Sequence, residues 1–222
     1  MGREKAAKIL ETLRRNFSLP EWTGSPCRNV FATLIRTIIS QNTSDVNTAR
    51  AFEKISKKFR MTPEAFSKAS LEEIEECLKP AGLYRNKSRM IKRLSNIILE
   101  KFDGKLEKVL ALPTEEARKT LLMLPGIGRK TADILLLFCA KKPVVPVDTH
   151  VNRVSRRLGL APAQGSYEEV RLALQSLYDA EDYLAVHVLL ILLGRKYCKA
   201  RKPLCGSCPL NDVCPRVNVE DE

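Results

Sequence analysis

The amino-acid sequence predicts an all-α protein, and three observations support this fold class. Apolar residues recur every three or four positions through almost the whole chain, which is the period of an amphipathic helix. The one tract with β character, Val144 to Val147, is short and contains Pro146, so it does not predict a strand within a sheet. The connections between periodic segments are short turns rich in Gly and Pro, such as residues 23–26.

Helices in the first half of the chain are predicted from apolar spacing and from residues that favour helix starts. Apolar positions define a helix from Ala6 to Phe17, a second from Val30 to Ile39, and a third from Val46 to Phe59. For the second helix we expect Ser25 as the N-cap and Pro26 at the first helical position. A short helix is predicted after Thr62-Pro63.

Two capping boxes mark further helix starts, because a Ser is followed three residues later by a Glu. They begin at Ser70 and at Ser166. Apolar periodicity predicts additional helices over about 87–102, 115–124, 129–140, 149–159, 167–178 and 181–196.

The composition indicates a globular protein with a polyanionic partner. Of the 222 residues, 44% are hydrophobic and 29% are charged, which excludes a disordered or fibrous chain. The 38 Lys and Arg residues exceed the 26 Asp and Glu residues, which gives a formal net charge of +12. Such an excess of positive charge favours nucleic acid as the partner.

The sequence also predicts where the protein acts. The longest apolar stretch, Tyr183 to Leu193, is shorter than the roughly 20 residues that span a bilayer, and no signal-peptide pattern is present. We therefore expect an intracellular protein without a targeting signal, in the cytoplasm or nucleoid, and we expect it to be a monomer.

A glycine-containing turn between two predicted helices is the most informative segment. One helix ends near Leu122, a Pro-Gly-x-Gly turn follows, and the next helix begins near Arg129. Gly126 and Gly128 would let the backbone approach a ligand closely, and free N–H groups at the start of the second helix would face a DNA phosphate. The alternative is a tight turn without a ligand.

Lys130 and Asp148 are the candidate catalytic residues. Lys130 lies on the first turn of the second helix, where the helix dipole disfavours an ammonium and favours a free amine, the nucleophile of Schiff-base chemistry. The alternative is a solvated lysine that contacts phosphate. Asp148 opens another helix as an N-cap, and its carboxylate is a candidate to accept the lysine proton or to stabilise a cation. His150 is expected to be structural.

The seven cysteines divide into two groups. Cys27, Cys77 and Cys139 occur singly in apolar segments, where a small buried hydrophobic side chain is expected. The other four follow a C-x6-C-x2-C-x5-C pattern typical of a metal site: Cys198, Cys205, Cys208 and Cys214. A single C-x2-C favours a 4Fe–4S cluster over structural zinc, which usually shows two such pairs. We expect the metal to be structural, not catalytic.

These motifs together resemble the endonuclease III family, which comprises DNA glycosylases and abasic-site lyases of the helix-hairpin-helix superfamily. The resemblance rests on the hairpin Leu124–Ala132, the Val147–His150 segment and the four-cysteine pattern, and it extends over about residues 25–214. The Ser-Gln-Asn-Thr segment at residues 40–43 is more similar to archaeal than to enterobacterial members.

The resemblance implies roles for individual residues. Lys130 matches the Schiff-base lysine, Asp148 the essential aspartate, and the four cysteines the 4Fe–4S ligands. Gln41 matches the glutamine that fills the gap left by the flipped nucleotide, and Leu83 the leucine that wedges into the duplex. Further DNA contacts are expected from the hairpin and from basic residues beside the cysteines: Gly126, Gly128, Arg129, Arg195, Lys199, Arg201 and Lys202.

The resemblance also implies two lobes and a reaction. A six-helix domain over 23–139 would hold the hairpin (about 115–137), residues 1–22 and 140–222 would form the cluster domain, and DNA would enter between them. The expected partner is double-stranded DNA with damaged pyrimidines or abasic sites, and no catalytic metal is expected. Two alternatives are a monofunctional mismatch glycosylase, which lacks the lysine, and a DNA-binding module without chemistry.

Overall fold

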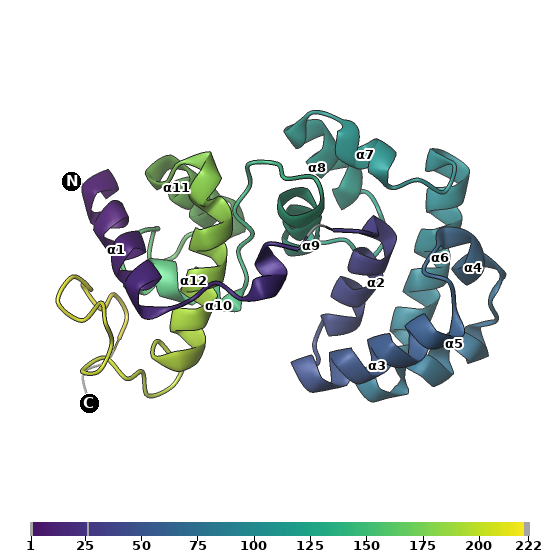
Figure 1. Cartoon of the computed structure of the whole chain (residues 1–222), viewed down its shortest axis with the longest axis horizontal. Coiled ribbons are helices and arrows are strands. Elements are labelled where there is room, and N and C mark those ends of the chain that lie inside the picture. The colour runs from purple at the N-terminus through teal and green to yellow at the C-terminus, as the bar shows by residue number, and fades with distance from the viewer. Residues whose placement is uncertain (1, 26, 220–222) are drawn as a thin grey trace. The chain divides into compact units, whose positions relative to one another are not determined.

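The computed structural model of the protein describes residues 2–25 and 27–219, and within these ranges the regular elements are helical and no strand is present (Figure 1). The prediction of an all-α fold is confirmed. The chain forms two compact units, unit 1 (Met1–Ser25 with Lys142–Glu222) and unit 2 (Pro26–Lys141). The predicted domain limits at residues 23 and 139 lie near these boundaries, and the assignment of each unit as a functional domain stays a prediction.

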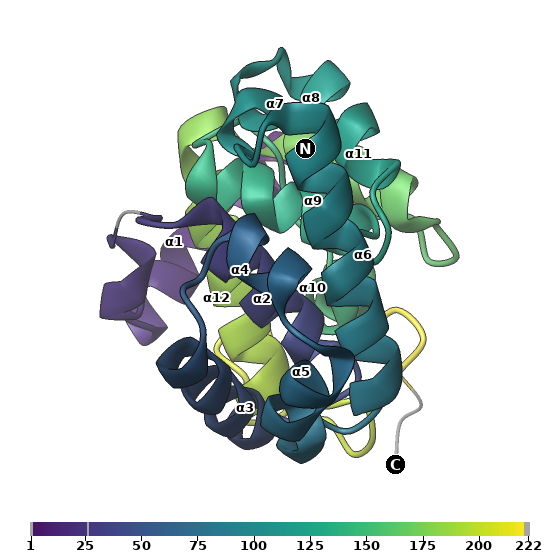
Figure 2. The same ribbon diagram turned by 90° about the vertical axis from the view of Figure 1, so that its right-hand side faces the viewer.

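Unit 2 is a bundle of helices around α6, the longest of them. Figure 2 shows α6 running past α2, α4 and α5, each of which contacts it. Buried aliphatic side chains on these helices, including Leu34, Ile38, Ile91 and Leu94, form the core. The elements of this unit are α2 (Val30–Ser40), α3 (Asp45–Lys58), α4 (Pro63–Lys68), α5 (Leu71–Leu78), η2 (Lys79–Ala81), α6 (Tyr84–Phe102), α7 (Glu107–Ala111), α8 (Thr114–Leu122), α9 (Arg129–Ile134) and η3 (Leu135–Cys139).

Unit 1 is built around α12, which is apolar on nearly every side and contacts α1 and α10. Beyond α12, residues 197–219 form a loop without helix or strand. No helix in the described part of the chain is long and apolar enough to cross a membrane. The elements of this unit are α1 (Gly2–Asn16), η1 (Glu21–Thr23), α10 (Thr149–Arg157), α11 (Tyr167–Leu177), η4 (Ala180–Asp182) and α12 (Tyr183–Lys196).

Several helices begin directly after an N-cap residue whose side chain accepts a hydrogen bond from a backbone N–H of the first turn. Both predicted capping boxes, at Ser70 and Ser166, are confirmed. The predicted cap at Ser25 is wrong: α2 begins at Val30, and Asn29 accepts a hydrogen bond from the backbone N–H of Ala32. Pro26, predicted at the first helical position, lies outside the described residues.

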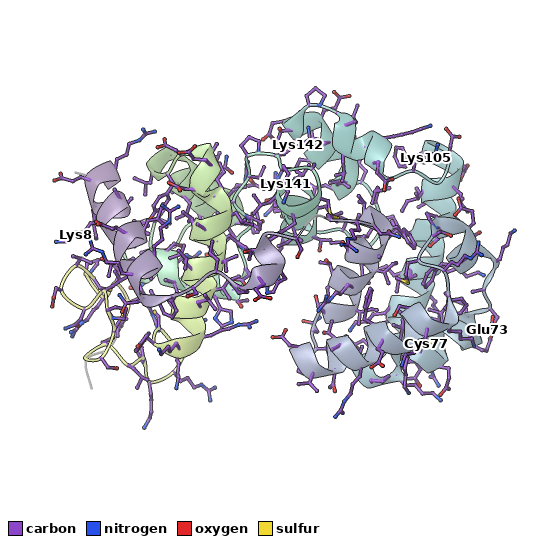
Figure 3. The ribbon with its side chains drawn as sticks, viewed as in Figure 1. Lys8, Glu73, Cys77, Lys105, Lys141 and Lys142 are labelled. Atoms are coloured by element: carbon purple, nitrogen blue, oxygen red, sulfur yellow. A yellow bond between two sulfur atoms is a disulfide. The ribbon has the colours of Figure 1, made fainter. Side chains whose placement is uncertain are left out.

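Two of the three isolated cysteines form a disulfide, which the sequence analysis did not predict. Cys27 and Cys139 form a disulfide within unit 2, although the sequence predicted small buried hydrophobic residues at both positions. The residues are 112 positions apart, and sequence spacing gave no indication that the fold brings them together. Cys77, labelled in Figure 3, is a buried free thiol on α5, as expected.

Candidate functional site

The predicted hairpin is present in unit 2, where α8 ends at Leu122 and α9 begins at Arg129. The backbone conformation and the surrounding space differ between its two glycines. Gly126 has a φ of +80°, and a Cβ placed there would lie 2.1 Å from the Sδ atom of Met90. Gly128 has a φ of −87°, and a Cβ there would meet no atom within 4 Å. The fold therefore requires glycine at 126, whereas at 128 it leaves open space in front of the backbone.

The start of α9 is available to a ligand. Its N-cap is Gly128, so no side chain accepts a hydrogen bond from the first-turn N–H groups. Lys130, the second residue of α9, is exposed, and Arg129 is exposed beside it. Free N–H groups at a helix start, flanked by two cationic side chains, are suited to bind a phosphate.

Gln41 lies next to this hairpin. It directly follows α2, and its side-chain amide Nε2 donates a 3.1 Å hydrogen bond to the carbonyl of Gly126. The structure therefore brings together two segments that the sequence predicted separately as DNA contacts. The contact leaves Gln41 half-buried and held against the turn.

Leu83 has two unusual properties. It is 58% exposed, and its backbone adopts the left-handed conformation with φ of +47°. Left-handed backbone is uncommon for a residue other than glycine and is strained. An exposed large apolar side chain on a constrained backbone is suited to insert between bases. Leu83 combines the two features at one position.

Asp148 lies in unit 1, where it caps α10. Its Oδ1 accepts a 2.8 Å hydrogen bond from the backbone N–H of Val151, and the predicted N-cap role is confirmed. The side chain is half-buried, which leaves part of the carboxylate accessible. Lys130 belongs to unit 2 and Asp148 to unit 1.

His150, on the first turn of α10, has a structural environment. Its Nδ1 lies 3.1 Å from Nη2 of Arg153, which also donates to the carbonyl of Gly194. Burial lowers the pKa of His150 from its ordinary value, and the nearby Arg153 acts in the same direction, whereas Asp148 raises it. A neutral imidazole that accepts a hydrogen bond from Arg153 agrees with this environment.

The four clustered cysteines surround one pocket of unit 1. Cys198, Cys205, Cys208 and Cys214 all line it, together with apolar side chains such as Leu158 and Leu193. Among the described residues, no three His, Cys, Asp or Glu side chains are arranged to hold a single metal ion. Four cysteine thiols around one pocket are the ligand set of a 4Fe–4S cluster.

The pocket affects the protonation of two of the four thiols. Burial raises the pKa of Cys208 and of Cys214 above the ordinary value. Thiolates are the form that binds iron, so iron binding here would release protons.

Sequence analysis missed Arg157, at the end of α10. Its Nη1 lies 3.6 Å from Sγ of Cys198, and its guanidinium also donates to the backbone carbonyls of Lys199 and Ala200. The Cys214 thiol in turn donates to the Arg157 carbonyl over 3.5 Å. One arginine thus joins both ends of the cysteine loop to α10. The only sequence signal was an arginine pair at i and i+4, Arg153 and Arg157, on one helix face.

The basic residues beside the cysteines are displayed on the surface. Lys199, Arg201 and Lys202 are exposed in the loop, and Arg195 is exposed at the end of α12. Lys196, the next residue, lies over the Phe17 and Tyr197 rings, with Nζ 5.1 Å from the centroid of Tyr197. The hydrogen bonds from Arg157 fix the loop backbone at Lys199, so the first of these charges has a defined position.

Comparisons with known proteins identify the family of this chain. A family model of the HhH-GPD superfamily of base excision DNA repair proteins matches residues 35–180, and a model of the iron–sulfur binding domain of endonuclease III matches residues 198–214. Endonuclease III of Sulfolobus acidocaldarius is 37% identical, covering 84% of this chain and 82% of the relative. Endonuclease III of Escherichia coli K12 is 35% identical, covering 96% of each chain.

Solved structures show the same similarity. A trapped endonuclease III–DNA covalent intermediate, 32% identical, superposes with a TM-score of 0.82 and covers 96% of each chain. A thermostable thymine-DNA glycosylase, 22% identical with a TM-score of 0.74, shares the fold. Because a family model covers most of the chain and full-length relatives exceed 30% identity, the chain belongs to the endonuclease III family of HhH-GPD base excision DNA repair proteins, and it carries the iron–sulfur binding domain of that family.

Proposed function

We propose that the protein is a bifunctional DNA glycosylase and abasic-site lyase that removes oxidised pyrimidines, with Lys130 as its nucleophile. The observation that carries this proposal is the exposed Lys130 on the first turn of α9, directly after a turn with an open face at Gly128. Membership of the endonuclease III family supports both activities. The family similarity to DNA-bound structures supports DNA as the substrate.

The reaction has two chemical stages. The Lys130 amine attacks C1′ of the damaged nucleotide and displaces the base, and the sugar opens to form an imine with the lysine. Loss of a proton from C2′ then breaks the C3′–O bond, which cleaves the strand 3′ to the lesion. Asp148 is the carboxylate that accepts the lysine proton or stabilises positive charge on the sugar.

Access to C1′ requires that the damaged nucleotide leaves the base stack, which costs a few kcal/mol. Gln41 fills the gap that the nucleotide leaves, and Leu83 wedges into the duplex. Support comes from the exposed, left-handed backbone of Leu83 and from the hydrogen bond between Gln41 and Gly126. Poor stacking of damaged pyrimidines lowers the cost of extrusion and contributes to selectivity.

The remaining residues bind the DNA backbone and the metal group. Gly126, Gly128 and Arg129 present the phosphate site of the hairpin, and a second basic surface comprises Arg195, Lys199, Arg201 and Lys202. Cys198, Cys205, Cys208 and Cys214 would hold a 4Fe–4S cluster. The cluster supplies cross-links that fold the loop, and no step of base excision passes through it. The protein acts on double-stranded DNA as a monomer inside the cell.

Borohydride trapping tests the proposal, because borohydride reduces an imine to a stable covalent adduct. Wild-type protein should become cross-linked to a duplex that contains thymine glycol or an abasic site. Lys130→Gln should give no adduct, whereas Lys119→Gln, which alters an exposed lysine on α8 of the same hairpin, should retain it. Base release without an adduct in the wild type would instead identify a monofunctional glycosylase.

A further inference from the structure

Lys87 is a buried lysine that connects two distant segments of unit 2. Its side chain lies near the start of α6, and the residue is only 4% exposed. Its ammonium Nζ donates to the carbonyl of Ile39 over 2.8 Å and to the carbonyl of Ala81 over 3.0 Å. These two hydrogen bonds join the chain at positions 39 and 81 through one side chain.

Both carbonyls belong to helix C-termini. Ile39 lies in the last turn of α2, and Ala81 is the last residue of η2. The last carbonyls of a helix have no partner within the helix and carry the negative end of its dipole, so a cation is favoured there. Lys87 therefore caps two helices at once with a single charge.

Gln41 and Leu83, the two residues expected to insert into the DNA duplex, follow these helix ends. Gln41 is the C-cap of α2, two residues after Ile39. Leu83 is also two residues after its anchor, Ala81, and is separated from it only by Gly82. The left-handed backbone at Gly82 and Leu83, with φ of +64° and +47°, directs the chain out of η2 directly after the capped carbonyl.

Burying the Lys87 ammonium between these two segments costs desolvation free energy. Burial lowers the pKa of Lys87 from its ordinary value. The described residues provide it with two backbone carbonyls and with no carboxylate in an ion pair. An apolar residue would avoid the desolvation of the ammonium but would leave the carbonyls of Ile39 and Ala81 without this donor, so the role of Lys87 lies in the two segments that its hydrogen bonds hold.

A second lysine on α6 also caps a helix end and serves as a comparison for Lys87. Lys92 also donates to backbone carbonyls, those of Ser67 and Ala69 at the end of α4. It lies one and a half helical turns beyond Lys87, and the segment it caps carries none of the residues assigned to DNA binding. Lys92, which is half-buried, therefore provides a control for the loss of a lysine that donates to two backbone carbonyls.

We propose that Lys87 is a positioning residue for nucleotide extrusion, whose ammonium fixes the ends of α2 and η2 so that Gln41 and Leu83 enter the duplex as one pre-organised unit. The inference rests on the proposed roles of Gln41 and Leu83. Pre-organised groups lose little conformational freedom on binding, so this arrangement lowers the cost of opening the base stack.

The test compares Lys87→Met with Lys92→Met, after circular dichroism has shown that both variants are folded. The first measurement is the ratio of affinities for a duplex with a tetrahydrofuran abasic analogue and for an undamaged duplex. Lys87→Met should lower this ratio about 10- to 100-fold, the range for a misplaced positioning group, and Lys92→Met should leave it unchanged. A 2-aminopurine opposite the analogue should brighten on binding of the wild type and less with Lys87→Met.

Single-stranded DNA separates extrusion from chemistry. Lys87→Met should trap a single-stranded abasic oligonucleotide with borohydride at the wild-type rate, because no duplex has to be opened. If the wild type fails to trap an abasic duplex with borohydride, the proposed function is wrong. If the wild type traps it and Lys87→Met matches Lys92→Met in the duplex measurements, the inference about Lys87 alone is overturned.

A double-mutant cycle tests whether Lys87 acts through the two inserted residues. In a Gln41→Ala, Leu83→Ala background, adding Lys87→Met should change the affinity ratio by less than about twofold, because its effect is no longer transmitted. A full additive loss would show that Lys87 acts by another route and would overturn the proposal. If Lys87→Met does not fold, Lys87→Gln, which retains one donor group for these carbonyls, replaces it in every measurement with the same expected direction.

Discussion

The Sδ atom of Met90 lies 2.1 Å from the point where a Cβ on Gly126 would stand, so the α6 helix packs directly against the backbone of the hairpin turn. With the left-handed φ of +80°, this contact leaves glycine as the one residue that fits at 126. Gly128, two residues later, has neither constraint. The two glycines of one motif therefore have separate causes, one internal to the fold and one related to the ligand.

This difference predicts opposite behaviour for two alanine variants. Gly126→Ala should lower the free energy of unfolding by about 1–3 kcal/mol, because it forces a strained backbone and displaces Met90. Gly128→Ala should cost less stability than Gly126→Ala, because it meets no steric clash and loses only the N-cap preference of Gly over Ala. It should weaken binding to DNA, because its methyl group occupies the space in front of the α9 N–H groups. Urea unfolding and DNA titration measure the two effects. Equal DNA affinity for Gly128→Ala and wild type would contradict the phosphate site.

The sequence predicted most helices because local signals and tertiary structure agree there. The capping boxes at Ser70 and Ser166 and the N-cap at Asp148 are satisfied by bonds within a few residues, so no distant information was needed. α7 (Glu107–Ala111) was missed, since five residues are too few to show a helical period. Ser25 was predicted as the cap of α2, but Asn29, which has the same capping chemistry, is the cap in the structure.

The candidate site was predictable where a motif is contiguous and not where it is assembled by the fold. The hairpin and the cysteine loop are short segments whose spacing indicates their chemistry. The hydrogen bonds of Lys87 to Ile39 and Ala81, and those of Arg157 to the cysteine loop, join positions far apart in sequence. The spacing within a single sequence does not identify the distant partners of such contacts.

The contact of Arg157 with Cys198 predicts a role in retaining the cluster. Wild-type protein purified without air should be brown, with absorption near about 400 nm and about four irons per chain. Arg157→Met should lose iron faster in the presence of a chelator, because it removes a hydrogen bond to a ligand sulfur and two bonds that order the loop. Arg14→Met, which removes a surface ion pair with Asp182 in the same unit, should retain its iron. Stoichiometric zinc in place of iron would contradict the cluster assignment.

The basic surface beside the cysteines predicts a change in salt dependence. Replacing both Arg201 and Lys202 by alanine should flatten the slope of log K against log salt by about 1–2 units, since each neutralised phosphate releases about one counterion. Lys8 and Lys105, both exposed and labelled in Figure 3, provide control substitutions that should leave the slope unchanged. An unchanged slope in the Arg201 and Lys202 variant would mean that this loop does not face the DNA backbone.

The environment of His150 predicts a pH dependence of stability. Burial lowers the pKa of folded His150 below its ordinary value of 6.5, so the unfolded chain takes up a proton first as the pH falls. The contribution of the neutral imidazole is complete above pH 6.5 and decreases as the pH falls from there through the lower folded pKa. Between about pH 7.5 and 5.5, the wild type should lose more unfolding free energy than His150→Gln. Identical pH profiles for the two proteins would rule out this effect of His150.

Asp148 has a demonstrated structural role as the cap of α10 and a proposed chemical role, and two substitutions separate these roles. Asp148→Asn should remain about as stable as the wild type, because Asn accepts the same hydrogen bond from Val151, whereas Asp148→Ala should lose about 0.5–2 kcal/mol. Both variants lack the carboxylate, so both should excise damaged pyrimidines about 10²–10⁴-fold more slowly, the range for a lost general base. Unfolding free energies and single-turnover rates on a thymine glycol duplex give the comparison. If Asp148→Asn excises the base at the wild-type rate while Asp148→Ala is both unstable and slow, the carboxylate acts only as a helix cap, and another group must accept the lysine proton.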